Sequence, residues 1–357
     1  MPQRTPLTRQ NRMREKSIFN RFFPIVATLF LCNIVLSAQT PQTKGLKTIN
    51  QQAAEAIVSF LASDNLEGRE AGFRGGRVAG DFIESQLKLM GIAPLFDTFR
   101  QPFEAYNAER QKRERFQVHP DSIAKLKNLP AHRKLSMTNI LGKIEGKNPQ
   151  EYVIVGAHYD HLGTDPTLNG DQTYNGADDN ASGVSAVLQI AKAFLATGVQ
   201  PERTVIFAFW DGEEKGLLGS QYFVNSFPQL KSIKGYLNFD MIGRNNDEAN
   251  PTHVVYFYTE AYPAFGNWLK QDIKTYGLNL SPNYRPWDRP IGGSDNSSFA
   301  KHDVPIIWYH TDGHKDYHQP SDHTEHLNWE KLTDITKAAF LNMWNMANLH
   351  TYTSSNQ

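Results

Sequence analysis

Residues 152–158 read YVIVGAH, an unbroken apolar run that ends in a histidine. Such a run is typical of a β-strand that helices cover on both faces. The segment SGVSAVLQIAKAFLATG follows at 182–198, and Ser182 is available as the N-cap of a helix there. Its apolar side chains recur at helical spacing on one face, at Val184, Val187, Leu188, Ala191, Phe194 and Leu195. A buried strand and an amphipathic helix in this order predict an α/β fold.

The alternation of strand and helix continues to the C-terminus. Further apolar runs predict strands at 204–210 (TVIFAFW), 235–239 (GYLNF), 253–258 (HVVYFY) and 304–309 (VPIIWY). Helical patterns follow at 216–226 and 264–277, and a long helix is expected from about Asn328. These elements predict a mostly parallel mixed sheet with helices on both faces.

The rest of the chain adds to this sheet without forming a second domain. Apolar residues at helical spacing predict helices at 49–63 and 75–91, joined by a charged, glycine-rich loop. Residues 98–135 mix short apolar stretches with charge runs and are too few for a domain, so we expect a peripheral edge region there. A single domain is therefore expected over 49–357, after a polar lead-in at 39–48.

The first 38 residues have the pattern of a secretory signal peptide. Six basic residues precede the apolar run FFPIVATLFLCNIVL and the small-residue segment SAQT, so we expect cleavage near Ala38 and export to the periplasm or the medium. The run is shorter than the roughly 20 residues of a membrane-spanning helix. An uncleaved anchor is the alternative, and translation starts at Met1 or Met13. We expect no stable membrane association after cleavage.

Composition excludes several classes of function. The 357 residues contain 37 Lys and Arg against 37 Asp and Glu, which gives no basic surface for a nucleic acid. Cys32 is the single cysteine and lies inside the apolar run, where no small residue precedes it as lipid attachment would require. The mature chain would contain no cysteine, which excludes disulfides, a catalytic thiolate and a cysteine-ligated zinc.

Acidic and histidine residues gather where the predicted strands end, which is where binding sites form in such sheets. One such group follows each of the strands at 152–158, 204–210 and 235–239, a histidine-rich loop (310–326) follows the strand at 304–309, and an acidic pair precedes the helix at 182–198. The groups are His158, Asp160 and His161; Asp211, Glu213 and Glu214; Asp240; and the pair Asp178 and Asp179. Imidazole and carboxylate without thiolate suit zinc or a related divalent ion.

Five ordered motifs resemble the secreted di-zinc aminopeptidases, whose relatives include glutamate carboxypeptidases, glutaminyl cyclases and the catalytically silent transferrin receptor. They are GAHYDHLG, NGADDNASGVSAV, FAFWDGEEKGLLGSQYF, NFDMIGR and GGSDNSSFAKHDVP with DYHQPSDHTEHLN. LASDNLEGREAGFRGG resembles the usual N-terminal segment, so the resemblance covers most of residues 55–350. It implies a zinc-peptidase architecture of the phosphorylase/hydrolase-like type, two Zn²⁺ per chain and peptide substrates with a free N-terminus.

The resemblance also implies the ligand set. It assigns His158 and Asp240 to one zinc, Glu214 and His318 to the other, and Asp179 as the carboxylate that bridges both. Asp178 would be a neighbour, although a shift of one position in the comparison would exchange it with Asp179. Asp160 corresponds to the acid that accepts the far N–H of His158 and raises its basicity.

Glu213 and Glu214 are adjacent, and the resemblance gives them different tasks. Glu214 would hold a metal, while Glu213 would be the general base that takes a proton from the attacking water and gives it to the leaving amine. The expected activity is hydrolysis of the N-terminal peptide bond by an exported metallo-aminopeptidase. Oligomeric state and residue preference are not readable from the sequence.

Other side chains remain open at this stage. The surplus histidines are His161, His302, His310, His314, His323 and His326, for which hydrogen bonding at the surface or in the core is the default. His314 is the rival of His318 as the last ligand. Ser294 and Asp295 resemble a segment near the substrate pocket. Some relatives place a tyrosine there to steady the oxyanion, and this chain does not, so Tyr284, Tyr309 and Tyr317 are candidates.

Three alternative functions also remain open. One is a glutaminyl-cyclase-like acyltransferase with a single zinc, which would not require both His158 and Asp240. A second is a carboxypeptidase or dipeptidase of the same fold, because the motifs specify the chemistry better than the end of the peptide that enters. The third is a non-catalytic binding ectodomain, a class whose members lose ligands or the base, whereas this chain has all of them.

Overall fold

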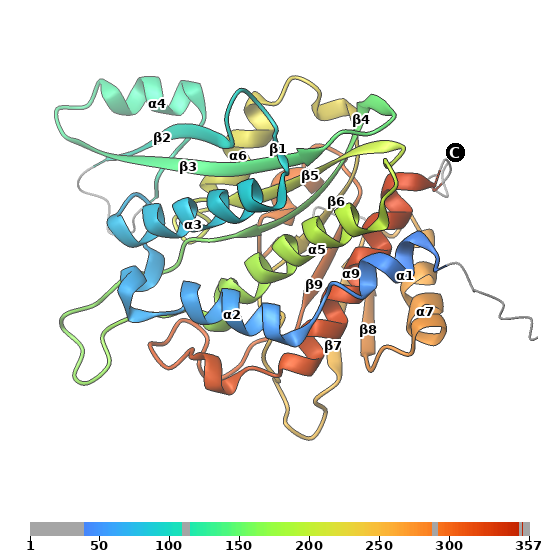
Figure 1. The fold of residues 1–357 in the computed structure, drawn as a ribbon. Helices are drawn as coiled ribbons and strands as arrows, with labels where there is room; N and C mark the ends of the chain where they lie inside the picture. The colour runs from blue at the N-terminus through green and yellow to red at the C-terminus, as the bar shows by residue number, and fades with distance from the viewer. Residues whose placement is uncertain (1–38, 109–114, 288–291, 350–351, 353–357) are drawn as a thin grey trace, which may run out of the picture. The chain divides into compact units, whose positions relative to one another are not determined.

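The computed structural model describes residues 39–108, 115–287, 292–349 and 352 (Figure 1). The predicted signal peptide, Cys32, both candidate start residues and most of the charge run at 109–115 lie outside these residues. The helices of eight or more residues are α2 (Gln51–Leu61), α3 (Arg74–Met90), α4 (Pro120–Lys127), α5 (Gly183–Thr197), α6 (Leu218–Ser226), α7 (Ala264–Tyr276) and α9 (Trp329–Asn348). Shorter helical segments are α1 (Pro41–Leu46), η1 (Asp64–Arg69), η2 (Ala177–Ser182), η3 (Leu230–Ser232), α8 (Asn296–Ala300) and η4 (Thr324–His326).

The described strands form one mixed sheet, in the order β1-β3-β5-β4-β6-β9-β7-β8, with β2 paired to β3. They are β1 (Ala93–Pro94), β2 (Arg100–Ala108), β3 (His132–Ile144), β4 (Asn148–His158), β5 (Arg203–Trp210), β6 (Ile233–Phe239), β7 (His253–Tyr258), β8 (Ser281–Pro286) and β9 (Ile306–His310). The four central strands β5, β4, β6 and β9 are parallel. β3 joins this centre antiparallel to β5, and β7 joins it antiparallel to β9.

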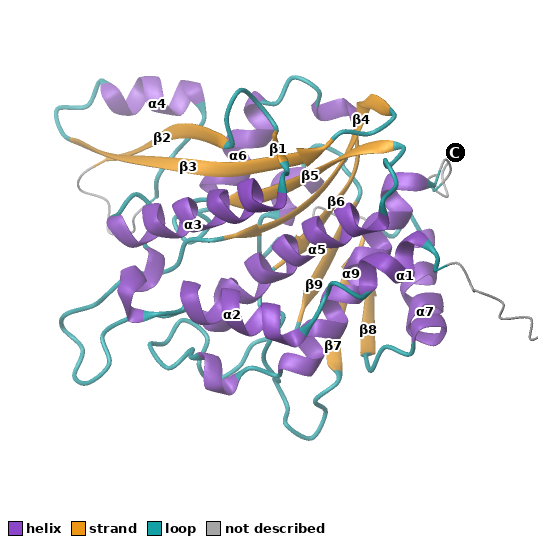
Figure 2. Cartoon of the chain, in the orientation of Figure 1, coloured by secondary structure: helices purple, strands orange, loops and turns teal. Residues whose placement is uncertain are grey.

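Helices pack against both faces of the sheet (Figure 2), which confirms the predicted fold class. Alternate residues of each central strand face opposite sides. Val153 and Val155 of β4 contact the larger apolar cluster, which includes α2, α3, α5, α7 and α9. Ile154 belongs to the second cluster, with α6 and α8. Because every residue of β5 is buried, each of its large apolar side chains contributes about 1.5–3 kcal/mol by leaving water.

The structure contains elements that the sequence analysis did not predict, most of them in the N-terminal half. Residues 41–46, assigned there to the polar lead-in, form α1, where the buried Gly45 packs closely against Phe340 of α9. The region 98–135 contains β2, which pairs along β3 at an edge of the sheet. β1, the greater part of β3, and β8 were also not predicted. They carry too few consecutive apolar residues to resemble the buried central strands.

Two details of α5 differ from the expectation. The Ser182 side chain does not cap the helix, because its hydroxyl donates to the carbonyl oxygen of Asp178 and accepts the N–H of Ile242. Leu195, expected on the buried face, is 40% exposed near the helix C-terminus. The Ser182 hydroxyl thus ties the turn before α5 to the segment after β6, and both of these segments reach the candidate site.

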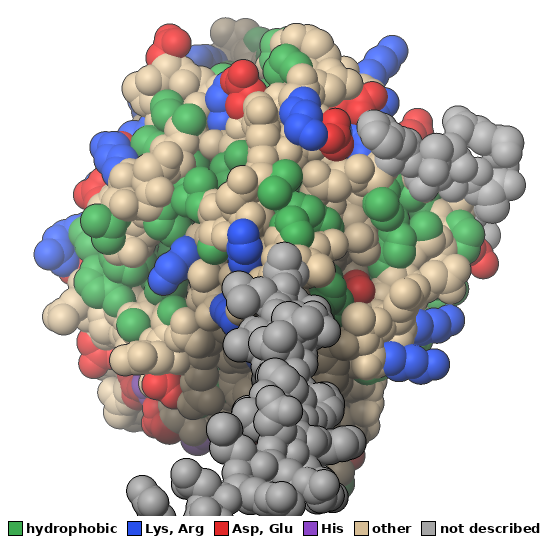
Figure 3. All heavy atoms as spheres, turned by 45° about the vertical axis from the view of Figure 1, so that its right-hand side comes forward, with side chains coloured by type: hydrophobic (Ala, Val, Ile, Leu, Met, Phe, Trp, Pro, Cys, Tyr) green, Lys and Arg blue, Asp and Glu red, His purple; other side chains and the backbone are tan. Residues whose placement is uncertain are grey.

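The surface carries charges of both signs. On the face in Figure 3, Lys and Arg side chains lie scattered among Asp, Glu and apolar side chains. Such a mixture accords with a formal net charge of zero. Among the described residues, none of the helices has the combined length and apolar character needed to cross a membrane.

The register of the central strands places their carboxyl ends in one row. His158 of β4 pairs with Trp210 of β5, and Ala157 pairs with Phe239 of β6. Phe239 in turn pairs with Tyr309 of β9. The segments that follow these strands therefore start side by side at one edge of the sheet, where sites form in α/β proteins.

Candidate metal centre

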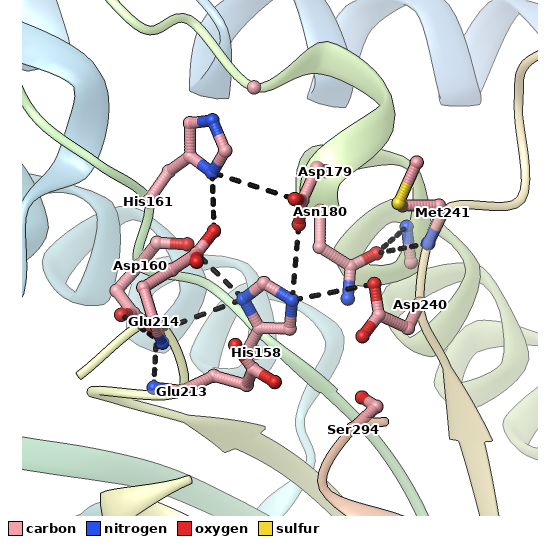
Figure 4. Close-up of polar contacts among 12 residues, drawn as sticks. His158, Asp160, His161, Asp179, Asn180, Glu213, Glu214, Asp240, Met241 and Ser294 are labelled. Atoms are coloured by element: carbon pink, nitrogen blue, oxygen red, sulfur yellow. Dashed lines mark hydrogen bonds and ion pairs between the residues drawn. The ribbon is translucent and has the colours of Figure 1, made fainter. Parts of the chain in front are cut away.

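A first group of possible metal ligands combines His158, Asp179 and Asp240. His158 ends β4, Asp240 follows β6 directly, and Asp179 lies in the irregular turn η2. The His158 Nε2 atom lies 3.3 Å from Asp179 Oδ1 and 3.6 Å from Asp240 Oδ1 (Figure 4). All three side chains are buried, and one donor atom of each lies within 4.8 Å of the others. One imidazole and two carboxylates at this spacing can hold a zinc ion.

A second group shares Asp179 with the first. The His318 Nε2 atom lies 3.2 Å from Asp179 Oδ2 and 3.2 Å from Glu214 Oε2. On the other side of Glu214, His161 Nδ1 lies 2.8 Å from Oε1, and it is 3.9 Å from Asp179 Oδ2. Asp179 thus turns one oxygen toward each group, as a carboxylate shared by two cations would.

His161 is the residue that sequence reasoning missed. It was grouped with the surplus histidines, yet it is fully buried and belongs to the second group. The signal that could have revealed it is its position three residues after His158, beyond the end of the same buried strand. His314, the rival of His318, lies elsewhere, with its Nε2 atom 3.2 Å from Asp178 Oδ2.

Asp178 and Asp179 are separated by their surroundings. The Asp178 carboxylate has other partners, because its Oδ1 atom accepts the N–H of Gly243 at 2.6 Å and its Oδ2 atom lies beside His314. The backbone N–H groups of both aspartates donate to the buried carboxylate of Asp322, at 3.0–3.2 Å. The structure therefore brings Asp179 into the cluster and leaves Asp178 beside it.

Asp160 lies beneath the cluster but contacts different atoms from those expected. The Nδ1 atom of His158 faces the backbone carbonyl oxygen of Asp160 at 3.2 Å, whereas the carboxylate is 3.8 Å away. The carboxylate instead accepts the backbone N–H groups of Glu213 at 3.0 Å and Glu214 at 3.3 Å. Burial raises the pKa of Asp160 to about 7, although nearby His158 opposes this. The fully buried side chain thus positions the turn that carries the two glutamates.

The two glutamates differ in their environment. Glu213 begins a tight turn after β5, in which its carbonyl oxygen accepts the N–H groups of Gly216 and Leu217. Within the described part of the chain, the Glu213 carboxylate has no hydrogen-bond partner, and Figure 4 shows it on the side of His158 away from His161. Burial raises its pKa well above the usual value, and Glu214, among other acids, adds to this.

Glu214 has the opposite shift. Burial and the charge of Asp179 raise its pKa, but hydrogen bonds from His161 and His318 outweigh them and lower it to about 2. In His158, burial lowers the pKa, while Glu213, Asp179 and Asp240 raise it well above the usual value. The acids of this cluster therefore attract positive charge strongly.

The donor set fits two divalent cations. Four carboxylates converge on this space, from Asp179, Glu213, Glu214 and Asp240. When ionised they carry four negative charges, and removing such charges from water without counter-ions is very costly. Two divalent cations would balance them, and the imidazoles of His158, His161 and His318 lie around the same space.

A buried arginine organises the segment that carries Asp179. The guanidinium of Arg69 donates to five backbone carbonyl oxygens in three segments of the chain. They belong to Leu61, Tyr159, Asn175, Gly176 and Asp179. The side chain is 1% exposed. Burial lowers its pKa to about 10, so it remains charged at neutral pH. The arginine of the motif LEGREAG is therefore a buried positioning residue and not part of a solvated surface loop.

The tyrosines and the Ser294–Asp295 pair occupy distinct places. Tyr309 donates to Asn342 in the core, and Tyr284 packs edge-on against Tyr256, so neither faces the cluster. Tyr317 stacks on His318 at 3.8 Å between ring centroids and is 45% exposed. The Ser294 hydroxyl accepts from Asn238 of β6. Asp295 is fully buried, and burial raises its pKa to about 7.

Comparison with known proteins identifies a family. Residues 139–343 match the model of Peptidase family M28. The chain is 27% identical over 284 residues to leupeptin-inactivating enzyme 1 of Streptomyces exfoliatus, covering 79% of this chain and 53% of that protein. It is 38% identical over 174 residues to a probable leucine aminopeptidase 2 of Arthroderma benhamiae, covering 47% and 32%. The chain thus spans about half or less of the length of these relatives.

Solved structures share the fold. The LapA aminopeptidase of Legionella pneumophila superposes with a TM-score of 0.63 at 22% identity, over 87% of this chain and 74% of that one. A glutaminyl cyclase of Fimbriiglobus ruber superposes with a TM-score of 0.62 at 17% identity, over 83% and 95%. At these identities the similarity establishes the architecture alone.

Proposed function

Because the chain belongs to peptidase family M28, we propose that it is a zinc-dependent aminopeptidase that hydrolyses the first peptide bond of peptides with a free N-terminus. The observation that carries this proposal is the convergence of two His/Asp/Glu groups on a shared Asp179, next to a glutamate without a hydrogen-bond partner in the described chain. The names of the relatives support the choice of aminopeptidase over carboxypeptidase or dipeptidase.

We assign two zinc ions to this site. His158 and Asp240 would hold one, Glu214 and His318 the other, and Asp179 would bridge them. When bound, the ions would supply Lewis-acid chemistry that polarises the peptide carbonyl and lowers the pKa of water. The charge of the four converging carboxylates supports two ions rather than one.

Glu213 would act as the general base. Its carboxylate takes a proton from the attacking water while the water oxygen bonds to the carbonyl carbon. The same proton then passes to the nitrogen of the leaving amine as the C–N bond breaks. A carboxylate whose pKa is raised by burial holds a proton more readily, which suits this exchange. Asp160 would hold Glu213 in place through its hydrogen bond to the backbone N–H.

The test is a peptide-release assay. Purified protein loaded with zinc should release amino acids from unblocked peptides, should spare the same peptides with acetylated N-termini, and should lose activity on chelation. Restoration by added zinc is expected. Inertness of the zinc-loaded protein toward a broad panel of unblocked peptides would overturn the proposal.

A glutaminyl-cyclase-like activity is the second candidate, supported by the fold shared with the Fimbriiglobus ruber protein. In that reaction the α-amine of an N-terminal glutamine attacks its own side-chain amide and ammonia leaves. Incubation of a glutaminyl peptide with the protein separates the two proposals by mass. Loss of ammonia from the intact peptide, together with one zinc per chain, would favour cyclisation.

Export is also proposed, on the basic and apolar pattern of residues 1–38. These residues lie outside the described structure. Expression of the full chain, followed by cell fractionation and N-terminal sequencing, should give exported protein that begins near Gln39. Uncleaved protein in the cytosolic fraction would contradict this proposal.

A further inference from the structure

We infer that His161 is a fourth protein ligand of the second metal position, beside Asp179, Glu214 and His318. This inference rests on the proposed function only in assuming that divalent metal occupies the site. It makes the two positions unequal, because His158, Asp179 and Asp240 supply three protein ligands to the first position and leave it open. In zinc proteins, four protein ligands are typical of closed sites, and three ligands plus water are typical of catalytic ones.

The distances within the second group fit tetrahedral coordination. With zinc–ligand bonds of about 2.0–2.1 Å, neighbouring donor atoms of a tetrahedron lie about 3.3 Å apart. His318 lies 3.2 Å from oxygens of both Asp179 and Glu214. His161 Nδ1 lies 3.9 Å from Asp179 Oδ2 and 2.8 Å from Glu214 Oε1, on either side of this value. Glu214 thus meets His161 through Oε1 and His318 through Oε2, and both oxygens would face the ion. The two imidazole rings lie edge to face, with centroids 5.8 Å apart, and each places a nitrogen against an oxygen of the Glu214 carboxylate.

The backbone holds His161 in this position. Its N–H donates to the carbonyl oxygen of Arg69 at 3.2 Å, and it forms a parallel bridge with Glu70. Gly176, at a φ of 58°, allows the chain to pass close to the imidazole ring. A Cβ atom there would lie 2.6 Å from Cδ2 of His161, closer than real contacts permit. The ring is thus fixed between the Glu214 carboxylate and the segment that carries Asp179.

Metal binding would require Nδ1 of His161 to carry no proton. Without a metal, Nδ1–H donates to the Glu214 carboxylate, because an ionised carboxylate only accepts. As a ligand, Nδ1 would offer its lone pair and the proton would reside on Nε2. Nε2 is buried, without a partner among the described residues.

The alternative role for His161 is to orient Glu214 by a hydrogen bond alone, and two substitutions separate these roles. In His161→Asn the amide nitrogen can occupy the place of Nδ1 and still donate to Glu214, but an amide is a poor zinc ligand. His161→Ala removes both functions. His323→Asn is the matched control. His323 lies on the loop of His318 and pairs at 3.0 Å with Asp171, on the loop of His161, outside the cluster.

The experiment titrates the metal-free full chain with Zn²⁺ by calorimetry, and with Co²⁺ while recording visible absorption. Wild type and His323→Asn should bind two ions in unequal steps. Both His161 variants should bind the ion of the tighter step at least about 100-fold more weakly. That loss is at or above the largest one expected from removing a residue that only hydrogen-bonds to a ligand. The Co²⁺ spectrum of that step should change as a ligand is replaced by water. Thermal unfolding of the metal-free variants would show that they are folded.

Retention of wild-type affinity and spectrum in His161→Asn, with loss only in His161→Ala, would overturn the inference in favour of a hydrogen-bonding role. Equal affinity of the two steps in wild type would also overturn it. The readouts are independent of catalysis. A chain that titrates as expected but releases no amino acid from peptides would contradict the proposed function and leave this inference standing.

Discussion

At the scale of single residues, Glu213 and Glu214 are adjacent in the chain but face different partners. The Glu214 carboxylate contacts two imidazoles. The Glu213 carboxylate is buried beside other acidic side chains. Adjacent side chains on a tight turn point in different directions, so one turn can provide both a ligand and a base. The backbone hydrogen bonds from this turn to Asp160 make the arrangement rigid.

Substitution of each glutamate by glutamine should give different defects. Glu213→Gln keeps the size of the side chain and removes the proton acceptor, so kcat should fall about 10²–10⁴-fold while KM and zinc content change little. Glu214→Gln should bind less zinc and regain some activity in excess zinc. Steady-state kinetics and metal analysis of both variants test this. Near-normal turnover of Glu213→Gln would exclude it as the base, and loss of zinc in that variant alone would exchange the two roles.

Asp160 provides a second test at this scale. Its carboxylate accepts two backbone N–H groups and lies 3.8 Å from His158, so Asp160→Asn should disturb the glutamate turn more than the ligand histidine. An amide can accept one of these bonds but presents a donor to the other. We expect the substitution to lower kcat by a larger factor than it lowers zinc affinity. Steady-state kinetics and a zinc titration of the variant measure the two factors. The reverse pattern would indicate that Asp160 acts chiefly on His158.

At the scale of elements, several site residues lie on segments outside regular helices and strands, so side-chain hydrogen bonds must hold these segments in place. The buried Arg69 connects the end of η1 to the residue after β4 and to the segment before η2. A lone guanidinium that donates to several carbonyl oxygens satisfies acceptors that would otherwise be buried unpaired.

Arg69→Met should therefore destabilise the protein strongly. Each buried carbonyl oxygen left without a donor costs about 1–3 kcal/mol, so we expect a loss of at least about 3 kcal/mol in the free energy of unfolding. Urea unfolding of the metal-free protein measures this. Arg77→Met is the control, since the Arg77 side chain is exposed and makes a single hydrogen bond within the described residues, to the carbonyl oxygen of Gly72. Equal effects of the two substitutions would contradict the role assigned to Arg69.

Helix α7 contains a buried acid, Asp272, that should make stability depend on pH. Burial raises its pKa from 3.8 to about 7. Between these values the folded state binds more protons than the unfolded state, so stability falls as pH rises through this window. Above pH 7 the penalty is complete, at most about 4 kcal/mol and less where solvent screens the group.

Asp272→Asn should remove this penalty. The variant should be more stable than wild type at pH 8, and the difference should shrink toward pH 4. Urea unfolding of metal-free protein at several pH values tests this. The exposed Asp121 on α4 gives the control variant, Asp121→Asn, for which the difference from wild type should stay small throughout. A pH-independent difference for Asp272→Asn would show that packing, rather than ionisation, determines its effect.

At the scale of the whole molecule, metal should contribute to stability because the cluster joins segments from most of the chain. The carboxylates come from η2, the turn after β5 and the end of β6, and His318 comes from the loop after β9. Two zinc ions present at 100 times their dissociation constants would each stabilise the fold by about 2.7 kcal/mol.

Chelation should therefore lower the Tm by roughly 10 °C, and added zinc should restore it. Differential scanning calorimetry with and without a chelator measures this, and metal analysis should give two zinc ions per chain. The double variant Glu214→Gln, His318→Gln should show about half of the shift. An unchanged Tm after complete removal of metal would contradict a site that binds the folded state.

The sequence alone determined the alternation of central strands and helices, and therefore where the site lies. Buried parallel strands have long apolar runs, and the residues after each run must meet at one edge of the sheet. The predicted ligands His158, Asp179, Glu214, Asp240 and His318 were found by this reasoning together with a family resemblance. Their positions in the structure converge, although their roles remain predictions.

Only the tertiary structure decided which remaining polar groups join the site. His161 and Arg69 have no local pattern that distinguishes them from surface residues, because their partners lie on other segments of the chain. For the same reason the sequence did not reveal that the Asp160 carboxylate accepts the backbone N–H groups of Glu213 and Glu214. The edge strands β2 and β8 were also invisible, since half-exposed strands need no apolar run. Periodicity records which side of an element is buried, whereas the partner of a polar side chain depends on contacts distant in sequence.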